Sequence, residues 1–384
     1  MVNLLIEGRL KKEVIFSFII PARNASKGIS ETLSAIQSQG LPGAEIIVVL
    51  NGADDGTGLL KHKFTDVKWI NSNKVGRSAA RNKGAQAAVG RFLVFVDADV
   101  RLEKNWLREV YRYILSLPVD AVASSIVPIP EPGAVDTILD QFRFELLKWK
   151  TSGTFLSTIG PTREAIPLVS TAACVVRKDV FTLLHGFNER LERNEDADFS
   201  LRLFQSGYVI GSCSKAKAND RYIPNIGALR SLNYLFRTFE SRYFHYRPAR
   251  VGDVLRGYIF TNLNSNLRIG SVFFYSLLNQ LSFNMGALAN WLFNTTPLSL
   301  DTIKKNKIKV RRFSFEYGGS RYFLRDSFRV IFLNGQPKLC SLFGSSVNFD
   351  ENTASLFIRI LKNEVIKKSE KESLIFDGLF VSSK

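Results

Sequence analysis

Four short apolar runs, each followed by polar residues, constrain the fold of this chain most strongly. The runs are residues 13–20, 45–50, 67–70 and 91–96, and helical patterns at residues 29–36 and 78–89 separate them. A short apolar run rich in β-branched residues is typical of a strand buried on both faces. Strands that alternate with helices predict an α/β fold, with a doubly wound and mostly parallel sheet.

Three polar loops follow predicted strands, at residues 21–24, 51–57 and 97–99. In a doubly wound sheet, ligands bind beyond the carboxyl ends of the strands. We therefore expect the binding site of the protein along the edge where these three loops meet.

The loop Asp97–Ala98–Asp99 places two carboxylates one residue apart, directly after an apolar strand. Such a pair can hold a hard divalent cation, Mg²⁺ or Mn²⁺, and the cation can bridge a diphosphate. A D-x-D triplet alone is expected about once by chance in a chain of this length. Its position at a strand end favours a metal and diphosphate site over a turn with solvated acids.

Three further segments each allow a functional and a purely structural interpretation. Residues 51–57 form either a tight connection or a loop that contacts a nucleoside. Residues 76–84 open a helix with three cations, which suits a phosphate or a solvated basic face. Residues 195–198 put three acids in the first helical turn, where they complement the helix dipole. One of these acids could also take the proton from an attacking hydroxyl, and the two interpretations do not exclude each other.

In order and spacing, these segments resemble a family 2 glycosyltransferase of the Rossmann-like GT-A fold. The resemblance covers residues 14–210, and its matching segments are 18–24, 45–57, 76–84, 97–99, 185–189 and 195–203. It implies a GT-A catalytic domain that uses a nucleotide-diphosphate sugar and Mg²⁺ or Mn²⁺ in an inverting single displacement.

The resemblance also implies roles for individual residues. The expected donor contacts are Pro21, Ala22, Arg23, Asn24, Asn51, Asp55, Arg77, Arg81, Asp97 and Ala98. Asp99 and Asp97 would serve the metal, and His245 could complete its shell, as a histidine does in some GT-A enzymes. Asp196 would be the general base, supported by Glu195 and Asp198.

Two departures from the family pattern bear on the substrates. Leu50 and Asn51 stand where many members have one or two acids that contact the base and ribose. The Q-x-x-R-W acceptor motif of processive polysaccharide synthases is absent, which favours the transfer of a single sugar.

The charge is concentrated in the second half of the chain. Residues 1–220 hold 28 Lys and Arg against 24 Asp and Glu, whereas residues 221–384 hold 24 against 11. The net charges are therefore +4 and +13, and the second half is suited to an anionic partner such as a phosphate, a membrane surface or a nucleic acid. We expect a catalytic domain at 1–220, a basic and helical segment at 221–300 and a basic linker with a small α+β appendage at 301–384.

Residues 221–300 suggest where an acceptor binds. Residues 221–268 hold eight Arg and no Lys among many aromatic residues, a composition that fits phosphate recognition and also single-stranded nucleic acid. Residues 269–300 carry no charge, but their many amides make them a poor membrane span. An amphipathic helix in the membrane interface or a buried helical hairpin fits this stretch.

The sequence thus predicts an enzyme that moves one sugar to a glycan or polyprenyl-phosphate-linked acceptor. Three widely spaced cysteines and a start without an apolar core of signal-peptide length favour a cytoplasmic, peripheral place on the inner face of the cell membrane. A nucleotidyltransferase remains an alternative, although its Gly- and Lys-rich loop does not follow the first strand. A nucleic-acid-binding protein on a degenerate glycosyltransferase scaffold is the other.

Overall fold

The structure is a computed structural model, and it describes part of the chain. The described residues are 15–40, 43–52, 55–132, 156–158, 165–189, 191, 195–222, 310–341, 346–376 and 378–382. Residues 223–309 lie outside them, and with them His245, most of the predicted basic segment and the uncharged stretch. No helix within the described ranges is long and apolar enough to cross a membrane.

The N-terminal part of the described chain alternates strands and helices. Its strands are β1 (Phe16–Ala22), β2 (Ala44–Leu50), β3 (Lys68–Asn71), β4 (Phe92–Val96), β5 (Val100–Leu102), β6 (Ala121–Pro130), β7 (Leu156–Thr158), β8 (Ala165–Pro167), β9 (Ala173–Arg177) and β10 (Ile210–Tyr222). Its helices are α1 (Ile29–Gln37), η1 (Thr57–His62), α2 (Arg77–Ala87), α3 (Trp106–Ser116), α5 (Lys178–Leu183) and α6 (Glu195–Gln205).

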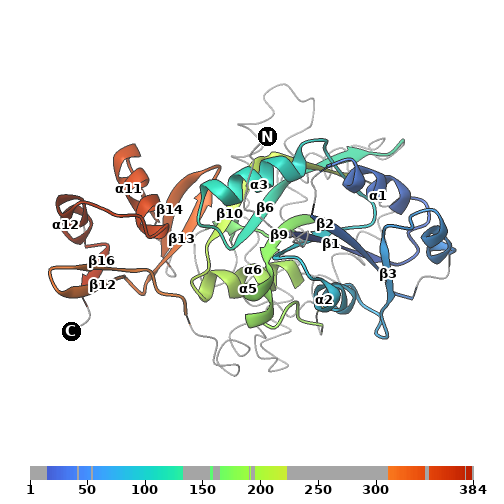
Figure 1. Cartoon of the computed structure of the whole chain (residues 1–384), viewed down its shortest axis with the longest axis horizontal. Coiled ribbons are helices and arrows are strands. Elements are labelled where there is room, and N and C mark those ends of the chain that lie inside the picture. The colour runs from blue at the N-terminus through green and yellow to red at the C-terminus, as the bar shows by residue number, and fades with distance from the viewer. Residues whose placement is uncertain are drawn as a thin grey trace, which may run out of the picture.

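The four predicted strands are β1 to β4, and they lie parallel in the order β4-β1-β2-β3. Helices α1 and α2 cover opposite faces of this sheet. Phe18 packs into the apolar cluster that contains Leu33 of α1, whereas its neighbour Ile19 packs into the cluster that contains Ala80 of α2. The prediction of a doubly wound, mostly parallel α/β sheet is therefore confirmed (Figure 1).

Strand β9 is the exception in this part of the sheet, because it runs antiparallel between β4 and β6. Strand β10 then runs parallel to β6, with a bulge between Cys213 and Lys217. The second half of β10 also pairs antiparallel with the short strand β5, so that Asp220 lies opposite Val100. This pairing brings the end of β10 to the loop that holds Asp97 and Asp99.

The C-terminal elements are β11 (Ser314–Tyr317), β12 (Ser320–Leu324), β13 (Phe328–Leu333), β14 (Gln336–Ser341), β15 (Ser346–Asn348), α11 (Glu351–Leu361), α12 (Lys368–Phe376) and β16 (Phe380–Ser382). Strand β13 pairs parallel with β10, and β14 and β15 follow antiparallel, so the described main sheet has 11 strands. A separate sheet of β11, β12 and β16 lies with α11 and α12 at the end of the molecule opposite β3 (Figure 1).

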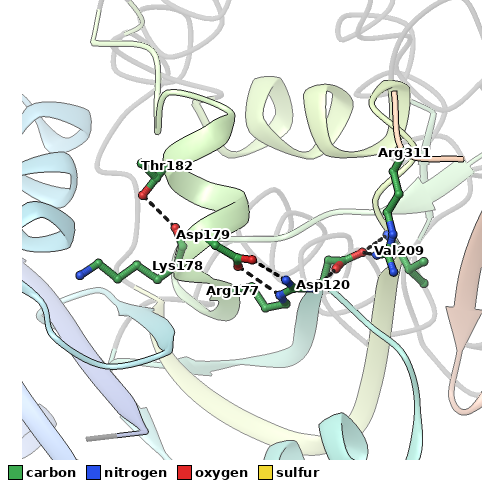
Figure 2. A network of polar contacts seen from close by, with 7 residues as sticks. All are labelled: Asp120, Arg177, Lys178, Asp179, Thr182, Val209 and Arg311. Atoms are coloured by element: carbon green, nitrogen blue, oxygen red, sulfur yellow. Dashed lines mark hydrogen bonds and ion pairs between the residues drawn. The ribbon is translucent and has the colours of Figure 1, made fainter. Parts of the chain in front are cut away.

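A buried carboxylate joins this C-terminal region to the rest of the sheet. Asp120 precedes β6, and it accepts hydrogen bonds from Arg177 Nη1 at 2.8 Å, from the backbone N–H of Val209 at 2.8 Å and from Arg311 Nη1 (Figure 2). The backbone N–H of Arg311 also donates to the carbonyl of Ser206 at 2.8 Å. Arg311 thus fixes the start of the C-terminal region beside the turn that follows α6. The predicted division at residues 220 and 300 stays a prediction.

Candidate active site

The Asp97–Asp99 turn leaves β4 at the carboxyl edge of the sheet. It is held from two sides: the backbone N–H of Asp97 donates to the carbonyl of Ala172 at 3.2 Å, and the hydroxyl of Thr32 in α1 donates to the carbonyl of Ala98 at 2.9 Å. The Asp97 side chain is 28% exposed, and Asp99 is exposed. The turn therefore presents both carboxylates at a fixed position that a ligand can reach.

A third carboxylate, Asp220, joins this pair, and the sequence did not identify it. Asp220 is partly buried, and burial, followed by the charges of Asp99 and Asp97, raises its pKa to about 7. Partial desolvation and the Asp97 carboxylate likewise raise the pKa of Asp99. Asp97 and Asp99 are therefore close enough to Asp220 to disfavour its ionisation. One signal in the sequence could have pointed to Asp220. A strand that follows the acidic helix at residues 195–203 would end at the same carboxyl edge of the sheet as the Asp97–Asp99 turn.

The acid cluster of Asp97, Asp99 and Asp220 has the chemistry that suits a divalent cation, since carboxylate oxygens are the ligands that Mg²⁺ and Mn²⁺ prefer. A cation would also relieve the repulsion that, after burial, raises the pKa values of Asp99 and Asp220. In the side-chain positions of this structure, however, no three acids, histidines or cysteines among the described residues are placed so that they could hold a metal ion. The expected contribution of His245 lies outside the described residues and stays a prediction.

Arg81 connects this cluster to helix α6. Its side chain is fully buried, with Nη2 at 2.5 Å from Asp97 Oδ1 and Nη1 at 2.6 Å from Glu195 Oε1. Its guanidinium carbon lies 5.9 Å from the ring centroid of Phe187. The sequence suggested that Arg81 contacts the donor, whereas in this structure its guanidinium faces two carboxylates of the protein. Arg77, at the start of the same helix, is exposed.

Asp196 lies in the first turn of α6, beside Glu195. Burial and then the charge of Glu195 raise the pKa of Asp196 to about 7, while Arg81 acts in the opposite direction. The side chain remains partly exposed. A carboxylate with these properties is suited to accept a proton near neutral pH.

Asp198, two residues on, has a structural task. It forms a buried ion pair with Arg202 at 2.6 Å, and Arg202 also donates to the backbone carbonyls of Leu184 at 2.5 Å and Gly186 at 2.8 Å. Asn82 of α2 holds the same turn, since it accepts from the N–H of Phe187 at 2.9 Å and donates to its carbonyl at 2.8 Å. The 185–189 segment therefore ties α6 to α2.

The two loops expected to hold the nucleoside are tied to each other by Asp55. Its carboxylate accepts from the backbone N–H of Ser26 at 2.9 Å and of Thr57 at 3.1 Å, and from the Thr57 hydroxyl. These bonds lower the pKa of Asp55, with that of the Thr57 hydroxyl the largest cause. The Thr57 hydroxyl also accepts from the N–H of Ala25 at 3.0 Å. Asp55 thus shapes the loops, and its oxygens are already engaged.

The other predicted nucleoside residues differ in accessibility. Asn51 is buried, and its Oδ1 accepts from the N–H of Gly76 at 3.1 Å, which joins the loop after β2 to the start of α2. Arg23 and Asn24 are exposed, whereas Ala22 is buried and Pro21 is partly buried. The exposed side chains of this group are the ones that a ligand can contact directly.

The sequence of this region matches a known family. Residues 17–183 match the model for glycosyl transferase family 2. The chain is 27% identical over 202 residues to glycosyltransferase AglE of Haloferax volcanii, covering 50% of this chain and 62% of the relative. It is 24% identical over 224 residues to the amylovoran biosynthesis glycosyltransferase AmsB of Erwinia amylovora, covering 56% of this chain and 73% of the relative.

Solved structures of glycosyltransferases also align with the chain. TarS of S. aureus in complex with UDP aligns with 80% of this chain and 96% of its own, at 15% identity and a TM-score of 0.44. The mannosyltransferase PcManGT from Pyrobaculum calidifontis, in complex with GDP-Man and Mn²⁺, aligns with 77% of this chain and 80% of its own, at 15% identity and a TM-score of 0.43.

Proposed function

We propose that the chain is a family 2 glycosyltransferase that transfers a single sugar from a nucleotide-diphosphate donor, with inversion at the anomeric carbon; the match of residues 17–183 to the model of that family supports this. The observation that carries this proposal is the position of Asp196. It is a carboxyl group with a pKa of about 7, connected through Glu195 and Arg81 to the Asp97–Asp99 turn. A base and a diphosphate site at one sheet edge suit a direct displacement.

In this mechanism the exposed residues of the first loops, Arg23 and Asn24, would contact the nucleoside, and Arg77 would contact the diphosphate. Arg77 is the first residue of α2, where the positive end of the helix dipole also favours an anion. Asp97, Asp99 and Asp220 would hold Mg²⁺ or Mn²⁺. The bound cation would stabilise the negative charge that grows on the departing nucleoside diphosphate.

Asp196 would accept the proton of the acceptor hydroxyl as that oxygen attacks the anomeric carbon. Its raised pKa increases its proton affinity, while Arg81 keeps its ionised form accessible near neutral pH. Glu195 would act through its bond to Arg81 and not on the substrate. Asp198 would keep the first turn of α6 in place through Arg202.

We further propose that the acceptor is a lipid-linked or surface glycan precursor at the cytoplasmic face of the membrane. The support is the net charge of +13 in residues 221–384, together with the Arg- and aromatic-rich composition of residues 221–268. The matched relatives AglE and AmsB are named as glycosyltransferases, and AmsB as one of amylovoran biosynthesis. The matched region spans about three fifths of the length of AglE, so the acceptor is proposed for this chain and is not taken from that relative.

A panel of nucleotide sugars, measured by thermal shift with Mn²⁺ and with EDTA, tests the donor assignment. We expect one nucleotide sugar to raise the unfolding temperature in Mn²⁺ and to lose most of this effect in EDTA. The Asp99→Ala variant should fold normally and lose the same shift. Pyrophosphate release from a nucleoside triphosphate and a sugar phosphate would instead support a nucleotidyltransferase.

A further inference from the structure

We propose that Arg81 is a positioning residue, which holds the metal-side carboxylate Asp97 and the first turn of α6 in a fixed relation. This inference rests on the proposed function, since it explains how the donor side and the base side of one site keep their geometry. It differs from the expectation that Arg81 binds the donor phosphates.

The guanidinium of Arg81 is too deeply buried to meet a donor. The Arg81 side chain has no exposed surface, so a diphosphate arriving from solvent cannot contact it without opening the core. The ring of Phe187 lies 5.9 Å from the guanidinium carbon, and Nε has no partner among the described residues. Arg77 is exposed and close enough to lower the pKa of Asp99, so it is the better phosphate contact on this helix.

Arg81 joins two acids from distant parts of the chain. Asp97 directly follows β4, and Glu195 begins α6 almost a hundred residues later in the chain. Both carboxylates are within 2.6 Å of guanidinium nitrogens, and Glu195 is 8% exposed. Without the Arg81 guanidinium, the carboxylates of Asp97 and Glu195 would face each other across a poorly solvated gap. Their repulsion would push the end of β4 and the start of α6 apart.

The contact of Arg81 with Glu195 lies next to the proposed base. Glu195 immediately precedes Asp196, and Asp97 belongs to the turn that would hold the metal. The planar guanidinium contacts one carboxylate through each Nη and so fixes both the distance and the direction between them. An ammonium group is a point charge and fixes neither as well. A shift of about 1 Å between donor and base costs on the order of 100-fold in rate.

The test compares Arg81→Lys and Arg81→Met with the matched control Arg77→Met on the same helix. We expect both Arg81 variants to lower kcat about 100-fold and to change the donor KM by less than about threefold, because a positioning contact acts on the transition state. Arg77→Met should instead raise the donor KM. If kcat of Arg81→Lys is as low as that of Arg81→Met, a positive charge at this position is not enough to hold the two carboxylates in place.

A binding measurement separates this inference from the proposed function. Calorimetry with uridine and guanosine diphosphates at saturating Mn²⁺ should give the same nucleotide affinity for wild type and Arg81→Lys, whereas the affinity for Mn²⁺ itself should fall about tenfold as Asp97 loses its support. If the Arg81 variants do not fold, Glu195→Gln removes one of the two contacts and should give the same loss in kcat. Inactivity of the wild type with every donor would overturn the proposed function and leave the Mn²⁺ result to decide the role of Arg81. A rise in donor KM and nucleotide dissociation constant as large as that of Arg77→Met, with kcat retained, would overturn the positioning role.

Discussion

Asp220 lies directly opposite Val100 in the antiparallel pairing of β10 with β5, one position along the chain from Asp99. The end of a long strand is thereby brought beside the Asp97–Asp99 turn. The pKa of Asp220 rises to about 7 because of burial and of the charges of Asp99 and Asp97. This relationship makes the acid cluster a three-carboxylate group built from two distant parts of the sequence.

The Asp220→Asn variant is expected to weaken metal binding. Removing one of three carboxylates should raise the Mn²⁺ concentration for half-maximal activity about 10- to 100-fold. The fold should be unaffected or slightly more stable, since a repelling acid is lost. Calorimetric titration with Mn²⁺ checks the first point, and an unchanged Mn²⁺ affinity would remove Asp220 from the metal site.

The activity should depend on pH through Asp196. The pKa of this group is raised to about 7, and the base works in its deprotonated form. Therefore kcat/KM should fall about tenfold per pH unit below 7 and level off above it. A pH–rate profile at saturating Mn²⁺ measures this limb. A plateau that extends down to pH 5 would contradict the assignment of Asp196 as the base.

The raised pKa of Asp196 also has a consequence for stability. A carboxyl whose pKa is higher in the folded state destabilises the fold as pH rises from the unfolded value near 4 to the folded value near 7. Asp196→Asn should therefore unfold at the same temperature as wild type near pH 4. Above pH 7 it should unfold a few degrees higher. Thermal scans from pH 4 to above pH 7 measure this difference. Equal unfolding temperatures of the two proteins at every pH would contradict the raised pKa of Asp196.

The attachment of the C-terminal region depends on Arg311. Arg311→Met removes one of the two arginines on the buried Asp120, which should cost about 1.5–3 kcal/mol of unfolding free energy. Arg312→Met is the matched control, because the ion pair of Arg312 with Asp326 is exposed and 3.4 Å long. Its loss should cost less than about 1 kcal/mol. Urea denaturation compares the two, and equal effects would contradict the importance of the Asp120 network.

The parts of the fold that the sequence predicted are those with local signals. Strands β1 to β4 correspond to apolar runs, each followed by polar residues, and the Asp97–Asp99 turn follows the last run. An apolar run by itself indicates a strand that is buried on both faces, and such a strand belongs in the interior of a sheet covered by helices. The carboxyl edge was then predictable from the parallel arrangement.

The parts that the sequence did not predict depend on distant contacts. The second half of β10, residues 215–222, is polar, and only its pairing with β5 and β6 makes it a strand. The burial of Arg81 likewise requires Glu195, which lies 114 residues away. A basic helix start normally indicates a solvated face, so the pattern alone could not separate Arg77 from Arg81. The pairing of β13 with β10 is a contact of the same long-range kind.

The most direct test of the account is the release of nucleoside diphosphate from the identified donor in the presence of membrane lipid acceptors. Wild type, Asp196→Asn and Asp99→Asn should be compared, each with Mn²⁺ and with EDTA, and Asp326→Asn serves as a remote acidic control. We predict turnover in Mn²⁺ for the wild type and the control, and a loss of at least about 100-fold for both site variants. Wild-type turnover in the Asp196→Asn enzyme would contradict the account.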